Sequence, residues 1–163
     1  MNDAHLHLIV NHFPIVGITI GLLVLIVGYL IKNQQVKATS LGIFIFSALA
    51  AIAANYTGEG AEEIVEKIPG ISESLIHDHE ETAELFLTLS LILGGAALIT
   101  LFLQIKKMEV AVYGNILVII LSISSLVSAN YVGVSGGEIR HTEIRETSNS
   151  GNQPDVINDE DDD

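Results

Sequence analysis

Apolar positions along the chain gather into long uncharged blocks separated by short polar links. The blocks predict helices at about 12–31, 38–57, 79–105 and 109–132. Each is close to the roughly 20 residues that a helix needs to cross about 30 Å of hydrocarbon. A soluble bundle would carry a polar stripe on every helix, and these blocks carry almost none. The pattern therefore predicts an all-α integral membrane four-helix bundle over residues 1–145.

Polar stretches outside the blocks complete the expected organisation. Residues 58–78 predict an acidic loop, and the tail 146–163, which ends in five acidic residues, should be disordered because it cannot bury a core. The start of the first helix has two readings. Asn11 could cap it, with Pro14 in the first turn, or the helix could begin near Asp3 and be kinked by Pro14.

The distribution of lysine predicts an orientation in the membrane. Lys32 and Lys37 lie between the first two blocks, and Lys106 and Lys107 lie between the last two. The positive-inside rule puts both links in the cytoplasm of a bacterial inner membrane, with both termini and the 58–78 loop on the periplasmic side. All six histidines then share that outer side: His5, His7, His12, His77, His79 and His141.

Charge and composition exclude several functions. The net charge of −13 is almost all external, which disfavours nucleic acid as a partner and favours a basic soluble protein. The chain has no cysteine, which excludes disulfides, iron–sulfur clusters and thiolate metal sites. The serines of the last block have no partner base at their depth. We therefore expect an electron-transfer protein or a complex subunit rather than an enzyme.

The chain contains an internal repeat. The ends of the second and fourth blocks both read Ala-Asn-Tyr-x-Gly, so that Asn55 matches Asn130 and Gly58 matches Gly133. The pattern His-x-His opens each half. The repeat predicts a parallel duplication of a helical hairpin about an axis along the membrane normal, with His7 and His79 as symmetry mates. Asn55 and Asn130 should cap helices or orient imidazoles, while Gly58 and Gly133 should end helices.

The opening residues resemble those of a known family. The stretch from His7 to His12-Phe13-Pro14-Ile15 is similar to the typical His-Pro-x-x-x-His-Phe-Pro-Ile opening of a large bacterial family of small four-helix membrane proteins of unknown function. The Thr57-Gly58-Glu59 turn also matches, whereas Leu8 replaces the usual proline. The likeness extends to about residue 140. It implies a setting among respiratory proteins, and it carries over His7, His12 and His79 as site residues.

Three functions remain open on these residues. The first is a b-type heme held by two histidines, with Gly17 and Gly94-Gly95 making room and Asn55 and Asn130 in support; its partners would be quinol or a c-type cytochrome. The second is a zinc, copper or nickel ion, for which imidazole and carboxylate are suitable ligands. The third is a cofactor-free structural subunit packed against other membrane subunits. The candidate metal ligands are His7, His79, His12, His77 and His5.

Overall fold

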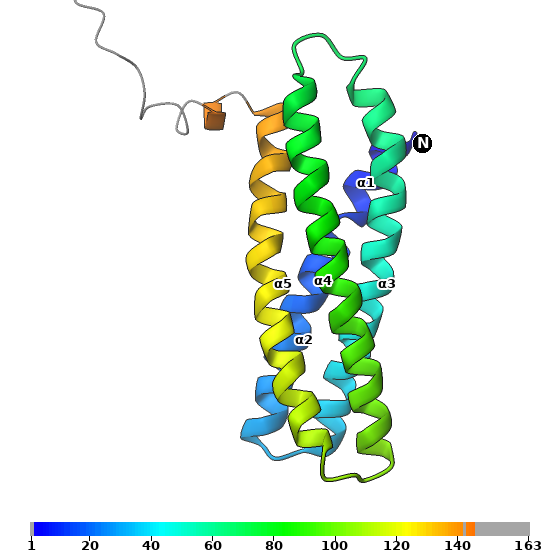
Figure 1. Cartoon of the computed structure of the whole chain (residues 1–163), viewed down its shortest axis with the longest axis vertical. Helices are drawn as coiled ribbons and strands as arrows, with labels where there is room; N and C mark the ends of the chain where they lie inside the picture. Colours follow the sequence, from blue (N-terminus) through cyan, green and yellow to red (C-terminus); the bar gives the residue numbers. More distant parts are fainter. Residues whose placement is uncertain (1, 142, 146–163) are drawn as a thin grey trace, which may run out of the picture.

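The computed structural model describes residues 2–141 and 143–145, and the regular secondary structure of this part of the chain is entirely helical. Four long helical stretches run side by side in a bundle (Figure 1). Each is long and apolar enough to cross a membrane, which confirms the predicted fold class. The elements are α1 (Asp3–Val10), α2 (His12–Leu30), α3 (Gln34–Val65), α4 (Glu73–Ile105) and α5 (Ala111–Arg140).

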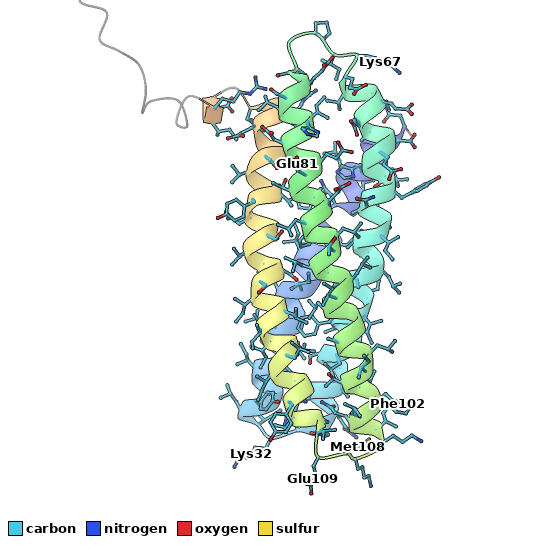
Figure 2. The ribbon with its side chains drawn as sticks, in the orientation of Figure 1. Lys32, Lys67, Glu81, Phe102, Met108 and Glu109 are labelled. Atoms are coloured by element: carbon cyan, nitrogen blue, oxygen red, sulfur yellow. The ribbon has the colours of Figure 1, made fainter. Side chains whose placement is uncertain are left out.

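The two ends of the bundle differ in charge. One, here called the lysine end, holds the α2–α3 and α4–α5 links with Lys32, Lys37, Lys106 and Lys107. The other, the histidine end, holds α1, the link at 66–72 and the end of α5. Figure 2 shows Lys32, Met108 and Glu109 at the first end and Lys67 at the second. Four of the five lysines therefore lie at the end opposite the histidines, and Lys67 is the exception.

A proline explains why the first membrane-spanning stretch is two helices. The Asn2 side chain caps α1 by accepting a hydrogen bond from the His5 N–H at 3.0 Å. Pro14 has no N–H for the carbonyl of Val10, and its ring crowds that carbonyl, so α1 ends at Val10. Asn11 makes no side-chain cap for α2. Of the two readings, the helix that begins near Asp3 and is broken by Pro14 is the one observed.

The helices run further at the histidine end than the apolar blocks indicated. α3 continues to Val65 rather than stopping near 57, α4 begins at Glu73, and α5 continues to Arg140. Most of the stretch predicted as a loop at 58–78 is therefore helical. Gly58 and Gly133 lie inside helices, so the expectation that they end helices is wrong. Ala61 and Ile76 are buried there, and this packing keeps the acidic extensions helical. The acidic tail 146–163 lies outside the described residues.

The internal repeat is visible in the two turns at the lysine end. Lys32 and Lys107 both have a left-handed backbone, with φ of 53° and 55°. The following N–H closes each turn, from Asn33 to Gly28 O and from Met108 to Leu103 O, both at 3.0 Å. These are the contacts of a Schellman helix end. The spacing between the two turns equals that between Asn55 and Asn130, which supports the predicted duplication.

Replacing Lys107 with glycine should stabilise the fold. A left-handed conformation costs an L-residue about 1–2 kcal/mol and costs glycine almost nothing. After the greater freedom of glycine in the unfolded chain is subtracted, we expect Lys107→Gly to raise the free energy of unfolding by about 0.5–1 kcal/mol. Chemical unfolding in detergent measures this. Lys106→Gly is the matched control, because Lys106 has a right-handed φ of −76°; an equal gain there would contradict the explanation.

Small residues bring the helices into close contact. Gly21 of α2 lies against the ring of Phe44, and Gly94 of α4 lies against Ala48, both from α3. Gly114 of α5 meets Thr100 of α4. Such contacts are typical of membrane helices, where lipid competes equally for apolar side chains and close backbone approach provides the attraction. The core between them is fully buried at Ile18, Leu25, Leu41, Phe44, Leu93 and Val118.

Candidate functional site

His7 is held against α3 by its Nδ1 atom. This atom lies 3.0 Å from the carbonyl oxygen of Ala54 and 3.3 Å from Oγ1 of Thr57. A carbonyl oxygen can only accept, so Nδ1 carries the proton and donates it. The neutral ring then keeps a lone pair on Nε2, which has no hydrogen-bond partner among the described residues. His7 is therefore oriented with its ligand-binding nitrogen unused.

His79 is held against α5 in the same way. Its Nδ1 lies 3.0 Å from Oγ of Ser135, and that hydroxyl donates to the carbonyl of Val132 at 3.2 Å. Because the Ser135 proton is used there, Oγ is free to accept from Nδ1–H. Thr82 extends the network, with its Oγ1 2.9 Å from Ser135 Oγ. His79 thus also keeps Nε2 without a hydrogen-bond partner in the described part of the chain.

Each imidazole rests on a glycine of the neighbouring helix. A Cβ atom added to Gly58 would lie 3.3 Å from Cε1 of His7, and one added to Gly136 would lie 2.9 Å from Cε1 of His79. The halves therefore repeat one arrangement, in which a histidine of the first helix sits on a glycine of the second. The match is imperfect, because the repeat pairs Gly58 with Gly133, and Gly133 faces open space. The seat in the second half is almost one helical turn further along α5.

The two imidazoles belong to one neighbourhood at the histidine end. Both side chains are half-buried, and they lie close enough for a charge on one to act on the other. α1 packs against α3, and α4 packs against α3 and α5. The helices that carry His7 and His79 are therefore not closed tightly against each other.

The other candidate histidines lie outside this pair. His5 and His12 are exposed, although His12 is near enough to His7 to interact with it electrostatically. His77 is exposed and lies 3.7 Å from Glu80 and 3.5 Å from Glu81 on its own helix. Across residues 2–141 and 143–145, no three His, Cys, Asp or Glu side chains gather closely enough to hold a metal ion. The five predicted ligands do not form one cluster.

His141 lies beyond the end of α5 and contacts Glu143. Its Nδ1 is 2.8 Å from Oε1 of Glu143. A backbone hydrogen bond within Glu143, together with the His141 contact, lowers the pKa of the Glu143 carboxyl. Both side chains are exposed, so this is a surface contact separate from the pair.

The imidazoles contact hydroxyl groups and not the asparagine amides that were predicted to orient them. The Asn55 amide donates to Glu59 of its own helix at 3.3 Å, and Asn130 is exposed beside Tyr131. Neither makes a hydrogen bond to an imidazole in the described structure. Thr57 and Ser135 do so instead, and the sequence analysis did not identify either. The sequence does contain a common feature, because Thr57 and Ser135 each directly precede the glycine that contacts the imidazole.

Gly17 and Gly94 were expected to make room for a heme, but other side chains of the protein fill the space beside both of them. Gly17 is occupied by the Ser47 side chain and Gly94 by Ala48, while Gly95 faces outward with nothing near it. All three lie on the apolar part of the helices rather than beside the histidines. The expectation that they create the heme slot is wrong, because helix packing accounts for the first two.

The glycine seat of His79 can be tested directly. Gly136→Ala places a methyl group 2.9 Å from Cε1 and 3.3 Å from Nδ1 of the ring. The ring must shift by a few tenths of an ångström, so we expect its bond to Ser135 to lengthen and its Nδ1 ¹⁵N NMR signal to move. Gly133→Ala is the control, because its Cβ meets nothing. An equal change of the His79 Nδ1 signal in both variants would contradict the contact between Gly136 and the imidazole ring.

Comparison with known proteins assigns the chain to a family. The model of the family described as "Predicted membrane protein (DUF2231)" matches residues 4–143, which include both imidazoles and all five helices except Asp3, the first residue of α1. Searches of curated proteins and of solved structures give no match.

Proposed function

The chain belongs to this family of predicted membrane proteins, and from that premise we propose that it transfers electrons through a b-type heme bound by His7 and His79. The supporting observation is the state of the two rings. Both are fixed through Nδ1, to Ala54 O and to Ser135 Oγ, and both keep the Nε2 lone pair. Metal-bound histidines characteristically have the other ring nitrogen held by a carbonyl or similar group, which raises the basicity of the ligand.

The number of available ligands favours heme over a bare metal ion. The porphyrin occupies four positions on its iron, so two imidazoles complete the coordination. A zinc ion takes three or four protein ligands, whereas no three His, Cys, Asp or Glu side chains gather closely enough among the described residues to hold a metal ion. α1 packs against α3, and α4 packs against α3 and α5, so the two ligands would come from helices that are not close-packed partners. When bound, such a heme supplies a one-electron redox couple.

The lengths of the helices support a site at the level of the outer lipid headgroups. α5 has 30 residues and is about 45 Å long, against about 30 Å of hydrocarbon. Exposed Tyr113 and Tyr131 are about 27 Å apart along α5, as expected of aromatic belts at the two interfaces. Gly58 and Gly136, the imidazole seats, lie just beyond Tyr56 and Tyr131 on their helices. Lysines at the other end support a cytoplasmic lysine end and periplasmic termini in a bacterial inner membrane.

The surroundings of the site suit two redox partners. A membrane quinol can approach from the lipid, while the acidic histidine end suits a basic c-type cytochrome. Acidic side chains there include Glu59, Glu62, Glu63, Glu66, Glu73, Asp78, Glu80, Glu81 and Glu84. Other membrane subunits could also pack on the exposed apolar faces of the helices.

An optical spectrum tests the proposal. The protein is expressed with ample heme, purified in detergent and measured oxidised and then reduced with dithionite. We expect a sharp b-type α band at one heme per chain. Purified protein without a heme spectrum, and unable to take up added hemin, would overturn the proposal.

A divalent metal is the second candidate. The observation that favours it is the acidic residues around His77, with Glu80 and Glu81 within 3.7 Å, since carboxylate and imidazole together suit zinc, copper or nickel. Elemental analysis of heme-free protein would distinguish this site from a cofactor-free structural subunit. A stoichiometric metal that is lost in His77→Ala would favour the metal site, whereas protein without bound metal would favour the structural role.

A further inference from the structure

Three buried serines in the membrane-spanning core have hydroxyl groups with no hydrogen-bond partner. Ser90 of α4 is 1% exposed, and Ser125 and Ser128 of α5 are 0% and 5% exposed. The Oγ atoms of all three have no partner in the described structure. An unpaired hydroxyl away from water is costly, so native interiors contain few of them. Three such groups on two adjacent helices require an explanation.

The usual solution for a hydroxyl in a membrane helix is found elsewhere in this protein. There the hydroxyl donates to a carbonyl three or four residues earlier on the same helix. Neighbouring Ser122 donates to Ile119 O at 2.8 Å, and Ser124 donates to Ile120 O at 3.1 Å. The residues that follow this pattern are Thr19, Thr39, Ser40, Ser47, Thr57, Thr82, Thr100, Ser122, Ser124 and Ser135. The three unpaired serines depart from it together.

The register of α4 against α5 brings the three serines to one level. The helices are antiparallel, with Thr82 bonded to Ser135 near the histidine end and Gln104 bonded to Asn115 near the lysine end. Counting inward from the first contact sets Ser90 level with Val127, and counting from the second sets it level with Ala129. Ser128 lies between these two positions on α5, and Ser125 is within about one helical turn of them. The three unpaired hydroxyls therefore lie at about the same depth along the α4–α5 pair.

We propose that the α4–α5 interface binds water at Ser90, Ser125 and Ser128, inside the membrane-spanning part of the bundle. A buried water typically makes about three hydrogen bonds to polar groups that would otherwise be unsatisfied. Three unpaired hydroxyls at about one level supply such a set. The ligand is water, held where the apolar environment makes each of its bonds strong.

This hydrated group lies on the inward side of the His79 network. His79, Ser135 and Thr82 already form a chain of contacts of 3.0 Å and 2.9 Å along the same interface. Bound water near Ser128 would continue the polar lining of the α4–α5 interface from the histidine end toward the middle of the membrane. The proposal stands independently of whether the histidines bind heme, because it rests on the serines alone.

Water-edited solid-state NMR of the protein in lipid bilayers tests the proposal. Magnetisation moves from water to nearby carbons, so we expect rapid build-up at the Cβ atoms of Ser90, Ser125 and Ser128. Ser47 is the internal reference, because it is also 0% exposed but donates to Ile43 O at 2.8 Å. Build-up at the three serines as slow as at Ser47 would overturn the proposal.

Thermal unfolding gives a second readout with opposite expected signs. If water links the hydroxyls, Ser90→Ala and Ser125→Ala each remove a hydrogen-bond partner and should lower the melting temperature by about 2–4 °C. If the hydroxyls are dry, their removal relieves a desolvation cost and the melting temperature rises, which contradicts bound water. Ser124→Ala is the control, because that serine is exposed and bonds its own helix.

Discussion

We expect His79→Ala and His7→Ala each to abolish the b-type spectrum of the purified protein, because under the proposed function each removes one of two axial ligands. Loss of a group that merely orients a metal ligand commonly costs 10–100-fold in affinity, so loss of a ligand itself should weaken heme binding by on the order of 100-fold or more. The measurement is a hemin titration of each variant, followed by the reduced-minus-oxidised spectrum. This is the largest effect that we expect on function.

His77→Ala is the matched control for these variants. It lies two residues from His79 on α4, yet its side chain is 67% exposed and contacts only glutamates of its own helix. We expect its heme affinity and spectrum to equal those of the unaltered protein. A loss at His77 equal to the loss at His79 would contradict the assignment of the ligands.

Gly94→Leu should disrupt the bundle more than any other single change considered. A Cβ atom at Gly94 already overlaps the Ala48 side chain of α3, so the three further carbons of leucine cannot fit without separating α3 from α4. Overpacking in a well-packed core typically costs about 1–3 kcal/mol, and a full side chain against a helix backbone should reach or exceed the top of that range. Unfolding in detergent, followed by circular dichroism, measures the loss.

The adjacent residue provides the control for Gly94→Leu. A Cβ atom at Gly95 meets nothing within 4 Å, and the residue is exposed on the outer face of α4. Gly95→Leu should therefore leave the free energy of unfolding unchanged or raise it slightly, since leucine is the better helix former. If both variants were equally destabilised, the α3–α4 contact would not explain the effect.

The membrane fold could be predicted from the sequence because its signal is local. Each uncharged block is long enough to span hydrocarbon, and no other packing of such blocks avoids exposing a large apolar surface. The ends of the helices were harder to predict from the sequence. The acidic residues around Glu62 resemble a solvated loop, yet α3 passes through them because Ala61 is buried against its neighbours. Burial depends on residues that are distant in sequence.

The candidate site could be predicted only in part. The repeat pairs His7 with His79, and both are half-buried in the structure, whereas His5 and His77 are exposed. Residues two apart on a helix point in nearly opposite directions, so only one histidine of each His-x-His can face the bundle. The roles of Thr57 and Ser135 depend on which turn of α3 or α5 lies opposite each imidazole. That register is set by packing, which the sequence pattern does not contain.

Gly58 shows why one residue type supports two interpretations. A glycine followed by acidic residues after an apolar block is a typical helix end, since glycine adopts the left-handed conformation readily. In the structure the same residue lies within α3, and its missing side chain gives His7 its seat. Only the identity of the neighbouring side chain distinguishes the two roles.

Near-infrared magnetic circular dichroism of the oxidised, heme-loaded protein identifies the axial ligands of the iron and so tests the proposed His7–His79 site. We expect a low-spin iron with two imidazole ligands, which becomes high-spin or loses heme in His7→Ala and in His79→Ala. A heme with any other ligand pair, or one whose signal is the same in both variants, would contradict the paired-histidine site.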